Sequence, residues 1–361
     1  MENKGKKILY VASNMRHINN FHLDYIKALR DSGDEVVVMA RGDDADINIP
    51  FEKKLFSPKN TACRKMIRQA VENGGFDAIF LNTSLAAFHV RFALRGKRRP
   101  RIVNMVHGYL FSREVGFLRR TLLSLCERIV KSKTDAIITM NSEDTEIAKS
   151  KKLTRGTVYT SLGMGATLRP CITSPDAIRA EFCGEGRLVL CFVGELSGRK
   201  NQEFLIRAHK ELAERITGAM LWLVGDGAEH DRLSDLVLEL GLNDSVILVG
   251  QRSDACDFIR AADVYVTASQ IEGMPFNVIE ALGAKKTVIA SRVKGHTDLI
   301  EHGTDGYLYD FRDTGAYLSL VEQVYRDGGV DPEAAYEKYK KYERSAVFES
   351  TLATIKEALY G

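Results

Sequence analysis

The sequence predicts an α/β protein made of two doubly wound parallel sheets, one in each half of the chain. Short apolar runs typical of buried strands alternate with helical patterns, and this alternation gives parallel sheets covered by helices on both faces. The 361 residues are too many for one ordinary core, so two domains of roughly 170 residues are expected. The series restarts after a segment with two prolines, Leu168–Pro175, which is the expected linker.

The N-terminal half carries the first alternating series. The apolar run Lys7–Ala12 is expected to be its first strand, and Phe21–Ser32 is expected to be its first helix. The further strands of this half are expected at Glu35–Ala40, Ala78–Asn82, Arg101–Val106 and Ala136–Thr139. These runs are short and mostly apolar, as in strands that are buried on both faces.

The C-terminal half repeats the same scheme. Strands are expected at Leu188–Val193, Met220–Val224, Ser245–Val249, Val264–Thr267 and Thr287–Ala290, and helices at Gln202–Arg215, His230–Leu240, Ala255–Ala261 and Pro275–Leu282. In such sheets ligands bind beyond the carboxyl ends of the strands, so the two domains, 1–170 and 171–340, should face a cleft there. The tail from Pro332 is helical, and its last part, 341–361, is expected to pack back on the first domain.

Charge is distributed unevenly over a chain whose net charge is only +3. Residues 1–172 hold 30 Lys and Arg against 17 Asp and Glu, which is a net charge of +13. Residues 173–361 hold 21 against 31, which is a net charge of −10. The N-terminal half should therefore attract an extended anionic partner.

The basic focus is the segment 97–133, with ten Lys or Arg and two Glu. Four apolar residues there fall at helical spacing: Leu118, Leu122, Leu125 and Ile129. Basic residues lie off this stripe: Arg119, Arg120, Arg128 and Lys131. An ordinary helix would place the stripe in the core, whereas a helix on anionic lipid would gain about 1 kcal/mol from each basic residue. Nucleic acid is not expected as a partner, because aromatic residues are not interleaved and no recognised binding motif is present.

The lack of a recognisable membrane helix or secretory signal, together with the cysteine spacing, favours a cytoplasmic protein. No apolar run approaches the roughly 20 residues of a membrane helix, and the apolar run after the basic N-terminus is too short for a secretory signal. Six cysteines show no CxxC pair and no regular spacing, so buried reduced thiols are expected rather than disulfides or a metal site. The basic half adds an expected peripheral association with the inner face of the cell membrane.

The segment from Glu272 to Glu280 carries two carboxylates seven residues apart, on either side of a Gly/Pro turn and a helix start. Glu280 falls about two helical turns beyond the turn, so its side chain can come back near the helix start. That helix start suits a phosphate because it carries unsatisfied N–H groups and a partial positive charge. Carboxylates accept hydrogen bonds from sugar hydroxyls, so the segment favours a nucleotide-sugar ligand.

Arg199 and Lys200 follow a predicted strand and a loop bounded by glycines, just before a predicted helix. Two adjacent cations at the carboxyl end of a strand are well placed for a diphosphate, although a solvated helix cap would look the same. The glycine pair in Gly225-Asp226-Gly227 lies at another strand end, where it lets a ligand approach the backbone or only makes a tight turn.

His107 follows the predicted strand Arg101–Val106 and precedes a glycine. A histidine there could contact a sugar hydroxyl or transfer a proton, but lone histidines more often serve as structural hydrogen-bonding groups. The other histidines show no HxxxH or HExxH spacing, so no metal site is expected. The sequence Asp44-Ala45-Asp46 sits in a polar loop and is expected to be a solvated turn.

Together these motifs resemble retaining glycosyltransferases of the large family four, which have the GT-B fold of two Rossmann-like domains. The segment Glu272–Glu280 is similar to that family's E-x7-E signature. The loop Gly194-Glu195-Leu196 with Arg199-Lys200-Asn201 is similar to its G-[RE]-L-x-x-x-K-[GN] loop. The resemblance covers nearly the whole chain, and the His17–Phe21 region resembles most the branch that builds bacterial surface polysaccharides.

The resemblance implies roles for particular residues. Glu280 would hold the ribose hydroxyls, Glu272 would face the donor sugar, and His107 would orient that sugar. Lys200 would bind the diphosphate, with Arg199 as second cation because Glu195 stands where many members have arginine. Other donor-binding residues would be Gly273, Met274, Pro275, Phe276, Asn277, Gly194, Gly225, Asp226 and Arg252.

The implied reaction moves a sugar with retention from a nucleotide-diphosphate donor, a UDP-sugar, to a lipid-linked or saccharide acceptor. Charge builds up on the leaving diphosphate, where cations and helix dipoles would stabilise it, so neither a metal nor another cofactor is expected. Attack from the leaving-group face would let the departing phosphate take the acceptor proton. Two alternatives stay open: a nonhydrolysing sugar-nucleotide epimerase, and a noncatalytic nucleotide-sugar-binding subunit of an assembly complex.

Overall fold

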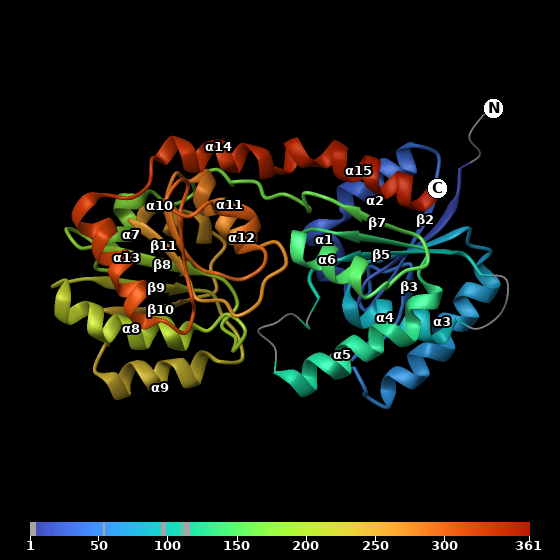
Figure 1. The fold of residues 1–361 in the computed structure, drawn as a ribbon, viewed down its shortest axis with the longest axis horizontal. Coiled ribbons are helices and arrows are strands. Elements are labelled where there is room, and N and C mark those ends of the chain that lie inside the picture. Colours follow the sequence, from blue (N-terminus) through green and yellow to red (C-terminus); the bar gives the residue numbers. More distant parts are fainter. Residues whose placement is uncertain (1–4, 53–54, 95–98, 110, 112–115) are drawn as a thin grey trace. The chain divides into compact units, whose positions relative to one another are not determined.

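The computed structural model describes residues 5–361 except 53–54, 95–98, 110 and 112–115 (Figure 1). Residue contacts divide the chain into two compact units. Unit 1 comprises Met1–Met164 and Phe348–Gly361, and unit 2 comprises Gly165–Val347. The chain therefore leaves unit 1, completes unit 2 and returns to unit 1 for its last residues.

Unit 1 is built on a seven-stranded parallel sheet. Its strands are β1 (Lys7–Val11), β2 (Glu35–Ala40), β3 (Ile47–Asn48), β4 (Ala78–Leu81), β5 (Arg101–Val106), β6 (Ala136–Thr139) and β7 (Thr157–Thr160). Their order in the sheet is β3-β2-β1-β4-β5-β6-β7. The order changes direction between β1 and β4, and ligands of such sheets bind beside this switch point at the carboxyl ends of the strands.

Unit 2 is built on a six-stranded parallel sheet of the same kind. Its strands are β8 (Val189–Val193), β9 (Met220–Val224), β10 (Val246–Gly250), β11 (Val264–Thr267), β12 (Thr287–Ser291) and β13 (Tyr307–Tyr309). Their order is β10-β9-β8-β11-β12-β13. The switch point therefore lies between β8 and β11.

Helices connect the strands of both units. In unit 1 they are α1 (Met15–Phe21), α2 (Leu23–Asp31), α3 (Lys59–Gly74), α4 (Ser84–Ala93), α5 (Phe117–Val130), a 3-10 turn (Lys131–Lys133) and α6 (Ser142–Ser150). In unit 2 they are α7 (Pro175–Glu181), α8 (Gln202–Arg215), α9 (His230–Leu240), α10 (Ala255–Ala261), α11 (Phe276–Gly283), α12 (His296–Leu299), α13 (Thr314–Asp327) and α14 (Pro332–Tyr342). The last helix, α15 (Arg344–Tyr360), lies mostly in unit 1.

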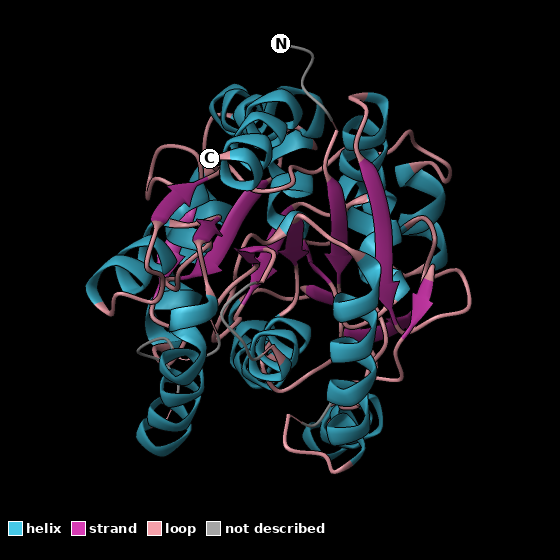
Figure 2. Cartoon of the chain, turned by 90° about the vertical axis from the view of Figure 1, so that its right-hand side faces the viewer, coloured by secondary structure: helices cyan, strands magenta, loops and turns pink. Residues whose placement is uncertain are grey.

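Side chains along β9 show how the sheet of unit 2 is covered on both faces. Leu221 and Leu223 are buried in a cluster with residues of α8, α9 and α13. Trp222 and Val224 point the other way, into a cluster with residues of α7 and α10. This period of two is that of a strand buried on both sides. Figure 2, in which unit 1 faces the viewer, shows helices on both sides of the strands there.

Unit 1 follows the same rule and adds the C-terminal helix. Leu9 and Val11 point toward α3 and α4, whereas the ring of Tyr10 contacts the ring of Phe80 on the opposite face. Figure 1 shows α15 beside α2, and the rings of Tyr25 and Phe348 lie 4.8 Å apart between them. The last residues of the chain are thereby part of the core of unit 1.

The predicted fold class is confirmed: both units are doubly wound parallel sheets covered by helices. The bounds of α8, β9 and β11 are those predicted from the sequence. The helix predicted at Phe21–Ser32 is α2, which begins at Leu23. A short helix that was not predicted, α1, precedes it. Only one residue of α1, Ile18, is buried, so α1 lacks the apolar periodicity that would reveal it.

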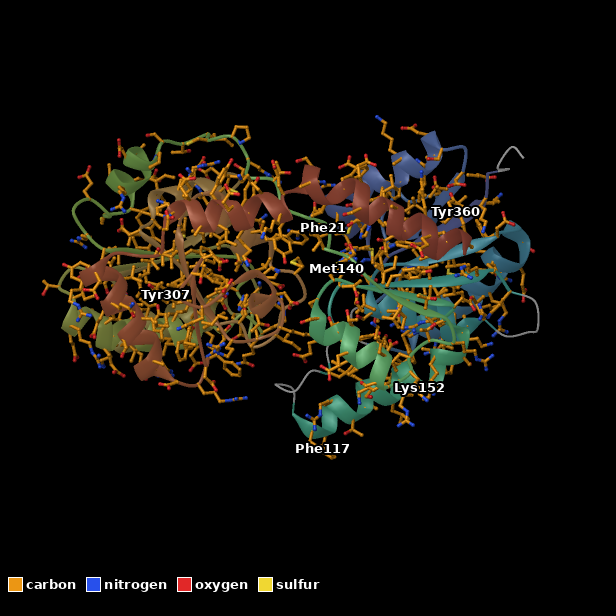
Figure 3. The ribbon with its side chains drawn as sticks, turned by 45° about the horizontal axis from the view of Figure 1, so that its top comes forward. Phe21, Phe117, Met140, Lys152, Tyr307 and Tyr360 are labelled. Atoms are coloured by element: carbon orange, nitrogen blue, oxygen red, sulfur yellow. The ribbon has the colours of Figure 1, made fainter. Side chains whose placement is uncertain are left out.

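The interpretation of α5 as an ordinary helix with its apolar stripe in the core is wrong. Leu118, Leu122, Leu125 and Ile129 are 83%, 47%, 50% and 55% exposed. Figure 3 shows Phe117 at the start of α5, on the outside of unit 1.

The buried face of α5 contains a charged residue, which explains why the apolar stripe was wrongly assigned to the core. Cys126, Glu127 and Val130 are buried instead of the stripe, and Glu127 receives two hydrogen bonds from the buried guanidinium of Arg91, at 2.8 and 3.0 Å. Counting apolar residues alone therefore selected the wrong face of the helix.

The proline segment Leu168–Pro175 lies just inside unit 2, which begins at Gly165. Asp257 of α10 accepts hydrogen bonds from the backbone N–H groups of Ile172 and Thr173, at 2.8 and 2.9 Å. The segment is thus fixed to α10. All six cysteines are free thiols, and three of them are buried: Cys63, Cys126 and Cys191.

Candidate functional site

The two cations predicted as diphosphate ligands lie in the loop between β8 and α8, at the switch point of unit 2. This loop ends at Asn201, which adopts a left-handed backbone conformation (φ 57°) before α8 begins. The backbone C=O of Arg199 accepts a hydrogen bond from the N–H of Gln270, at 2.9 Å. That bond joins the loop after β8 to the loop after β11, the neighbouring strand in the sheet.

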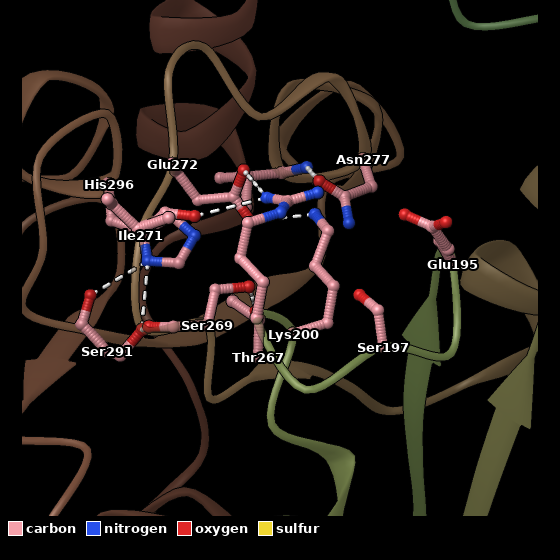
Figure 4. A network of polar contacts seen from close by, with 12 residues as sticks. Glu195, Ser197, Lys200, Thr267, Ser269, Ile271, Glu272, Asn277, Ser291 and His296 are labelled. Carbon is pink, nitrogen blue, oxygen red and sulfur yellow. Dashed lines mark hydrogen bonds and ion pairs between the residues drawn. The ribbon is translucent and has the colours of Figure 1, made fainter. Parts of the chain in front are cut away.

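Glu272 lies between the two cations. Lys200 Nζ lies 2.6 Å from Glu272 Oε1, and Arg199 Nη1 lies 3.1 Å from Glu272 Oε2 (Figure 4). Lys200 and Glu272 are 8% and 7% exposed, so this ion pair is shielded from water. The three side chains together carry one net positive charge at the carboxyl end of β8.

The cations decide the protonation state of Glu272. Burial raises the pKa of this carboxyl, but Lys200 and then Arg199 outweigh burial and lower it to about 2. Glu272 is therefore a carboxylate at neutral pH, and it can accept hydrogen bonds but cannot donate a proton.

His296 and Ser197 complete the surroundings of this group. Burial lowers the pKa of His296 to about 4, so the imidazole is neutral, and its Nδ1 lies 2.8 Å from the backbone oxygen of Ser291. The Ser197 hydroxyl is buried without a hydrogen-bond partner among the described residues. A buried hydroxyl of this kind, in the same loop as Lys200, can donate to a phosphate oxygen.

The turn Gly273–Asn277 leads from Glu272 into α11. Helix α11 begins at Phe276 with no side-chain cap, so its positive dipole end is directed at the turn. Asn277 Nδ2 donates to the backbone oxygen of Val193 at the end of β8, at 2.7 Å. Met274 and Pro275 are buried. The predicted turn thus lies beside the loop that carries the cations.

Two glycines let the loops after β8 and β9 touch through their backbones. A Cβ on Gly225 (φ 139°) would lie 1.9 Å from the oxygen of Gly194, and a Cβ on Gly227 would lie 2.2 Å from the oxygen of Leu196. Asp226 and Gly250 line a pocket of about 480 Å³ beyond these loops. The predicted glycines are therefore required by a close backbone approach next to a pocket.

Glu280 is influenced by other neighbours than Glu272 is: Cys256, Arg169 and Arg260. Burial raises its pKa to about 7, against the lowering effects of Cys256, Arg169 and Arg260. At neutral pH this carboxyl is a mixture of protonated and ionised forms. It can both donate and accept hydrogen bonds.

Arg252 is held in place by its neighbours. Its Nε and Nη2 donate to Asp254 at 2.8 and 2.9 Å, and its guanidinium lies over the rings of Phe182 and Phe258. The same arginine is one of the donor-binding residues that the resemblance implies. The structure places it two residues after Gly250, which lines the pocket described above.

His107 belongs to unit 1 and lies at the end of β5. Its ring centroid is 4.7 Å from that of His17 and 5.2 Å from that of His22. Burial, and then the neighbouring His17, lower the pKa of His107 well below its usual range. The imidazole is therefore neutral at neutral pH.

Within unit 2 the structure brings together most of the predicted site residues, whereas it places His107 with two other histidines. Sequence reasoning missed His296 and Ser197 in unit 2, and it missed His17 and His22 as partners of His107. One signal was available, since His17 closely follows β1 and His107 follows β5, and carboxyl ends of parallel strands share one edge. No helix in the described part of the chain has the length and apolar character needed to cross a membrane.

Comparison with known proteins identifies sequence relatives. Residues 175–346 match the family described as glycosyl transferases group 1, and residues 18–154 match glycosyltransferase family 4. The putative glycosyltransferase EpsD of Bacillus subtilis is 30% identical over 333 residues, covering 89% of this chain and 87% of EpsD. A second relative is an Escherichia coli protein named UDP-Gal:alpha-D-GlcNAc-diphosphoundecaprenol alpha-1,3-galactosyltransferase. It is 25% identical over 260 residues, covering 70% of this chain and 67% of that protein.

Solved structures match over the whole length as well. Anabaena HepE in complex with UDP-glucose superposes with a TM-score of 0.74 at 19% identity, covering 98% of this chain and all of HepE. That likeness shows the fold, and the match to EpsD over most of both chains shows the family. The chain therefore belongs to the glycosyltransferases and has their two-domain GT-B fold.

Proposed function

We propose that this protein is a retaining glycosyltransferase that moves a sugar from a UDP-sugar to a lipid-linked or saccharide acceptor in cell-surface polysaccharide biosynthesis. The observation that carries the proposal is the ion-paired group of Arg199, Lys200 and Glu272 at the end of β8, in which Lys200 and Glu272 are buried. Its two cations and one carboxylate match the two parts of the donor, a diphosphate and a sugar.

The cations supply the electrostatic part of the reaction. As the bond between the sugar and the diphosphate breaks, negative charge grows on the diphosphate. Lys200, Arg199 and the start of α11 are fixed groups that stabilise this charge without rearrangement. The Ser197 hydroxyl adds a donor to a phosphate oxygen. Transfer by this route requires neither a metal at the diphosphate nor another cofactor.

The two glutamates bind hydroxyl groups in this proposal. Glu272, ionised, accepts hydrogen bonds from the donor sugar, and Glu280, half protonated near neutral pH, exchanges hydrogen bonds with the ribose hydroxyls. The base occupies the region of Gly250 and Arg252, and His107 orients the donor sugar. The remaining donor contacts come from Gly194, Gly225, Asp226 and the turn Gly273–Asn277.

The proposed route to retention does not use Glu272 as a nucleophile. A carboxylate paired through both oxygens with cations, and with a pKa of about 2, is a poor nucleophile. In the proposed route the acceptor hydroxyl attacks instead from the side of the leaving group, and the departing diphosphate takes its proton. The new bond keeps the configuration of the donor.

Two relatives support the choice of donor and acceptor. HepE forms a complex with UDP-glucose, and the Escherichia coli relative is named for a UDP-sugar donor and a diphosphoundecaprenol-linked acceptor. An acceptor on a polyprenyl diphosphate lies at the membrane surface. We propose the same class of donor and acceptor here.

Helix α5 supports contact with an anionic membrane surface. Its exposed apolar residues form one outer surface of unit 1: Phe117, Leu118, Leu122, Leu125 and Ile129. Basic residues lie on or directly after the same helix: Arg120, Arg128, Lys131 and Lys133. Apolar insertion and attraction to anionic lipid act together on such a surface. The proposed location is the cytoplasm, with peripheral binding to the inner face of the cell membrane.

A donor panel tests the proposal directly. The protein is incubated with UDP- and GDP-sugars, with and without a polyprenyl-diphosphate saccharide, and free nucleotide and products are measured. Acceptor-dependent release of UDP, with a product of retained anomeric configuration, is expected. Conversion of the donor without acceptor would indicate an epimerase, and binding without turnover a noncatalytic subunit.

Substitutions tie the activity to the proposed group. Arg199→Ala keeps the Lys200–Glu272 pair, and Lys200→Ala removes the buried cation, so kcat should fall by roughly 10²–10³-fold in each. Lys210→Ala, at an exposed position of α8, is the matched control. Folding of unit 2 is followed by the fluorescence of Trp222, the single tryptophan. Unchanged turnover in folded Arg199→Ala and Lys200→Ala proteins would refute the proposal.

A further inference from the structure

Three histidine side chains from separate segments meet at the carboxyl end of the sheet of unit 1. His17 lies in α1 after β1, His22 lies between α1 and α2, and His107 follows β5. All three ring pairs have centroids within 5.2 Å of one another. His22 is fully buried and the other two are partly buried.

The ring nitrogens have the spacing of ligands that share one ion. One nitrogen from each ring lies within 4.8 Å of the others, and the Nε2 atoms of His17 and His22 are 3.2 Å apart. Nitrogens around one tetrahedral zinc ion lie about 3.3 Å apart, because each Zn–N bond is about 2.0–2.1 Å. One pair already has this spacing, and the third nitrogen lies within 4.8 Å of both.

One ring nitrogen of His107 has no hydrogen-bond partner in the described part of the chain. His107 Nε2 is buried and has no hydrogen-bond partner among the described residues. Buried polar atoms normally have a partner, and none of the residues that the structure describes supplies one to this atom. An ion between the rings would provide it.

Other groups orient the rings from behind, as in known metal sites. Tyr10 Oη lies 2.8 Å from Nδ1 of His22, which leaves Nε2 of His22 directed at His17. A backbone hydrogen bond with Asn82 holds His17. Metal-binding histidines commonly use their second nitrogen in this way, which fixes the tautomer and the ring orientation.

The protonation states suit a metal ion. Burial lowers the pKa of His17 to about 4 and that of His107 well below its usual range. Neutral imidazoles keep the lone pair that a metal needs. Nitrogen ligands also select among metals, because imidazole suits zinc-class ions and Mg²⁺ or Ca²⁺ prefer oxygen.

We propose that His17, His22 and His107 bind one divalent transition-metal ion of the zinc class. Three protein ligands leave a fourth, open position for water or a substrate hydroxyl. The site lies in unit 1 and shares His107 with the proposed transfer reaction, but metal binding is measured without donor or acceptor, so its test does not depend on transfer.

Cobalt(II) is the probe, because tetrahedral cobalt absorbs visible light and zinc does not. The full-length protein is freed of metal with a chelator, exchanged into chelator-free buffer and titrated with Co²⁺. A saturating visible spectrum at one Co²⁺ per chain is expected, and one equivalent of Zn²⁺ should abolish it. The absence of a saturable spectrum would overturn the proposal, since a plain hydrogen bond between His17 and His22 would then account for the cluster.

Variants assign the spectrum to these residues. His107→Ala and His17→Ala should lose it, and His230→Ala, at a half-exposed histidine of unit 2, should retain it. Tyr10→Phe keeps the ring but removes the hydroxyl behind His22, so Co²⁺ affinity should fall by about 10–100-fold. Circular dichroism checks the fold of each variant. A spectrum that persists in folded His107→Ala protein would place the ion elsewhere and refute the assignment.

Discussion

At the scale of single residues, Glu272 and Glu280 show how the surroundings of a carboxyl decide its chemistry. Both are largely removed from water, and burial raises the pKa of each. Lys200 and Arg199 reverse this effect at Glu272, which titrates at about 2. Glu280 has only weaker compensation and titrates at about 7. One turn and one helix therefore carry one carboxylate that stays ionised and one that titrates near neutral pH.

The raised pKa of Glu280 predicts a pH dependence of stability. Between about pH 4.5 and pH 7 the folded protein keeps a proton on Glu280 that the unfolded chain releases. The folded state then binds more protons than the unfolded state, so stability falls as pH rises through this window. The fall due to this residue is roughly 2–3 kcal/mol, since one pKa unit corresponds to about 1.4 kcal/mol.

Glu280→Gln tests this prediction because glutamine stays neutral at every pH. Urea unfolding of unit 2, followed by Trp222 fluorescence at pH 5 and pH 8, should show a smaller loss of stability in the variant than in the wild type. Glu185→Gln, at an exposed position of the same unit, should behave as the wild type. Equal pH dependence in the wild type and Glu280→Gln would contradict the raised pKa.

At the scale of elements, the loops after β8 and β9 depend on a close backbone approach at Gly225. Alanine there would place its Cβ 1.9 Å from the oxygen of Gly194, and the backbone φ of 139° is itself unfavourable for a side chain. Gly225→Ala should therefore destabilise unit 2 by several kcal/mol. Gly198→Ala is the control, because a Cβ on Gly198 of the neighbouring loop meets no atom within 4 Å.

Urea unfolding of the same two variants tests this prediction. The urea midpoint of Trp222 fluorescence should fall for Gly225→Ala and stay within experimental error for Gly198→Ala. If both variants unfold at the wild-type midpoint, the loops tolerate a side chain and the contact is not structurally required.

The sequence could predict which elements exist more easily than which elements are neighbours. Apolar runs identified β9, β11 and α8 with correct bounds because each is buried along its whole length or along one regular stripe. The pairing of Glu272 with Lys200 could not be predicted in this way. It depends on β11 lying next to β8 in the sheet, although two strands separate them in the sequence.

Helix α5 shows a second limit of what the sequence could predict, and its exposed surface yields a testable prediction. The inner face contains Glu127, which is paired with Arg91, so the apolar stripe that sequence periodicity assigned to the core lies outside.

Membrane contact of α5 predicts that the double variant Leu118→Ser, Leu122→Ser binds anionic liposomes more weakly in co-sedimentation, by about tenfold or more. The reason is that each leucine buried in the membrane contributes about 1.5–3 kcal/mol. Higher salt should weaken binding further.

Leu238→Ser is the matched control for the liposome experiment, since Leu238 is 61% exposed on α9 of unit 2. Neutral liposomes give the reference for the electrostatic part. Equal binding of the α5 variant and the Leu238→Ser protein would contradict a membrane role for α5.

At the scale of the whole molecule, the chain closes unit 1 only after unit 2 is complete. Ile355 of α15 is fully buried, and Thr351 Oγ1 donates to the oxygen of Gly163 at 2.9 Å. Lys6 Nζ donates to the oxygen of Leu359 at 3.1 Å. The first and last residues of the described chain therefore stabilise the same core.

This arrangement predicts that a substitution near the C-terminus weakens the N-terminal unit. Ile355→Ala should destabilise unit 1 by about 2–5 kcal/mol, as expected for a cavity in a packed core. Trp222 lies in unit 2, so the urea midpoint of its fluorescence should not change, while circular dichroism should show part of the helix signal lost at lower urea. Glu357→Ala, exposed on the same helix, should leave both signals unchanged. A parallel shift of the Trp222 midpoint in Ile355→Ala would instead show that both units unfold as one cooperative body.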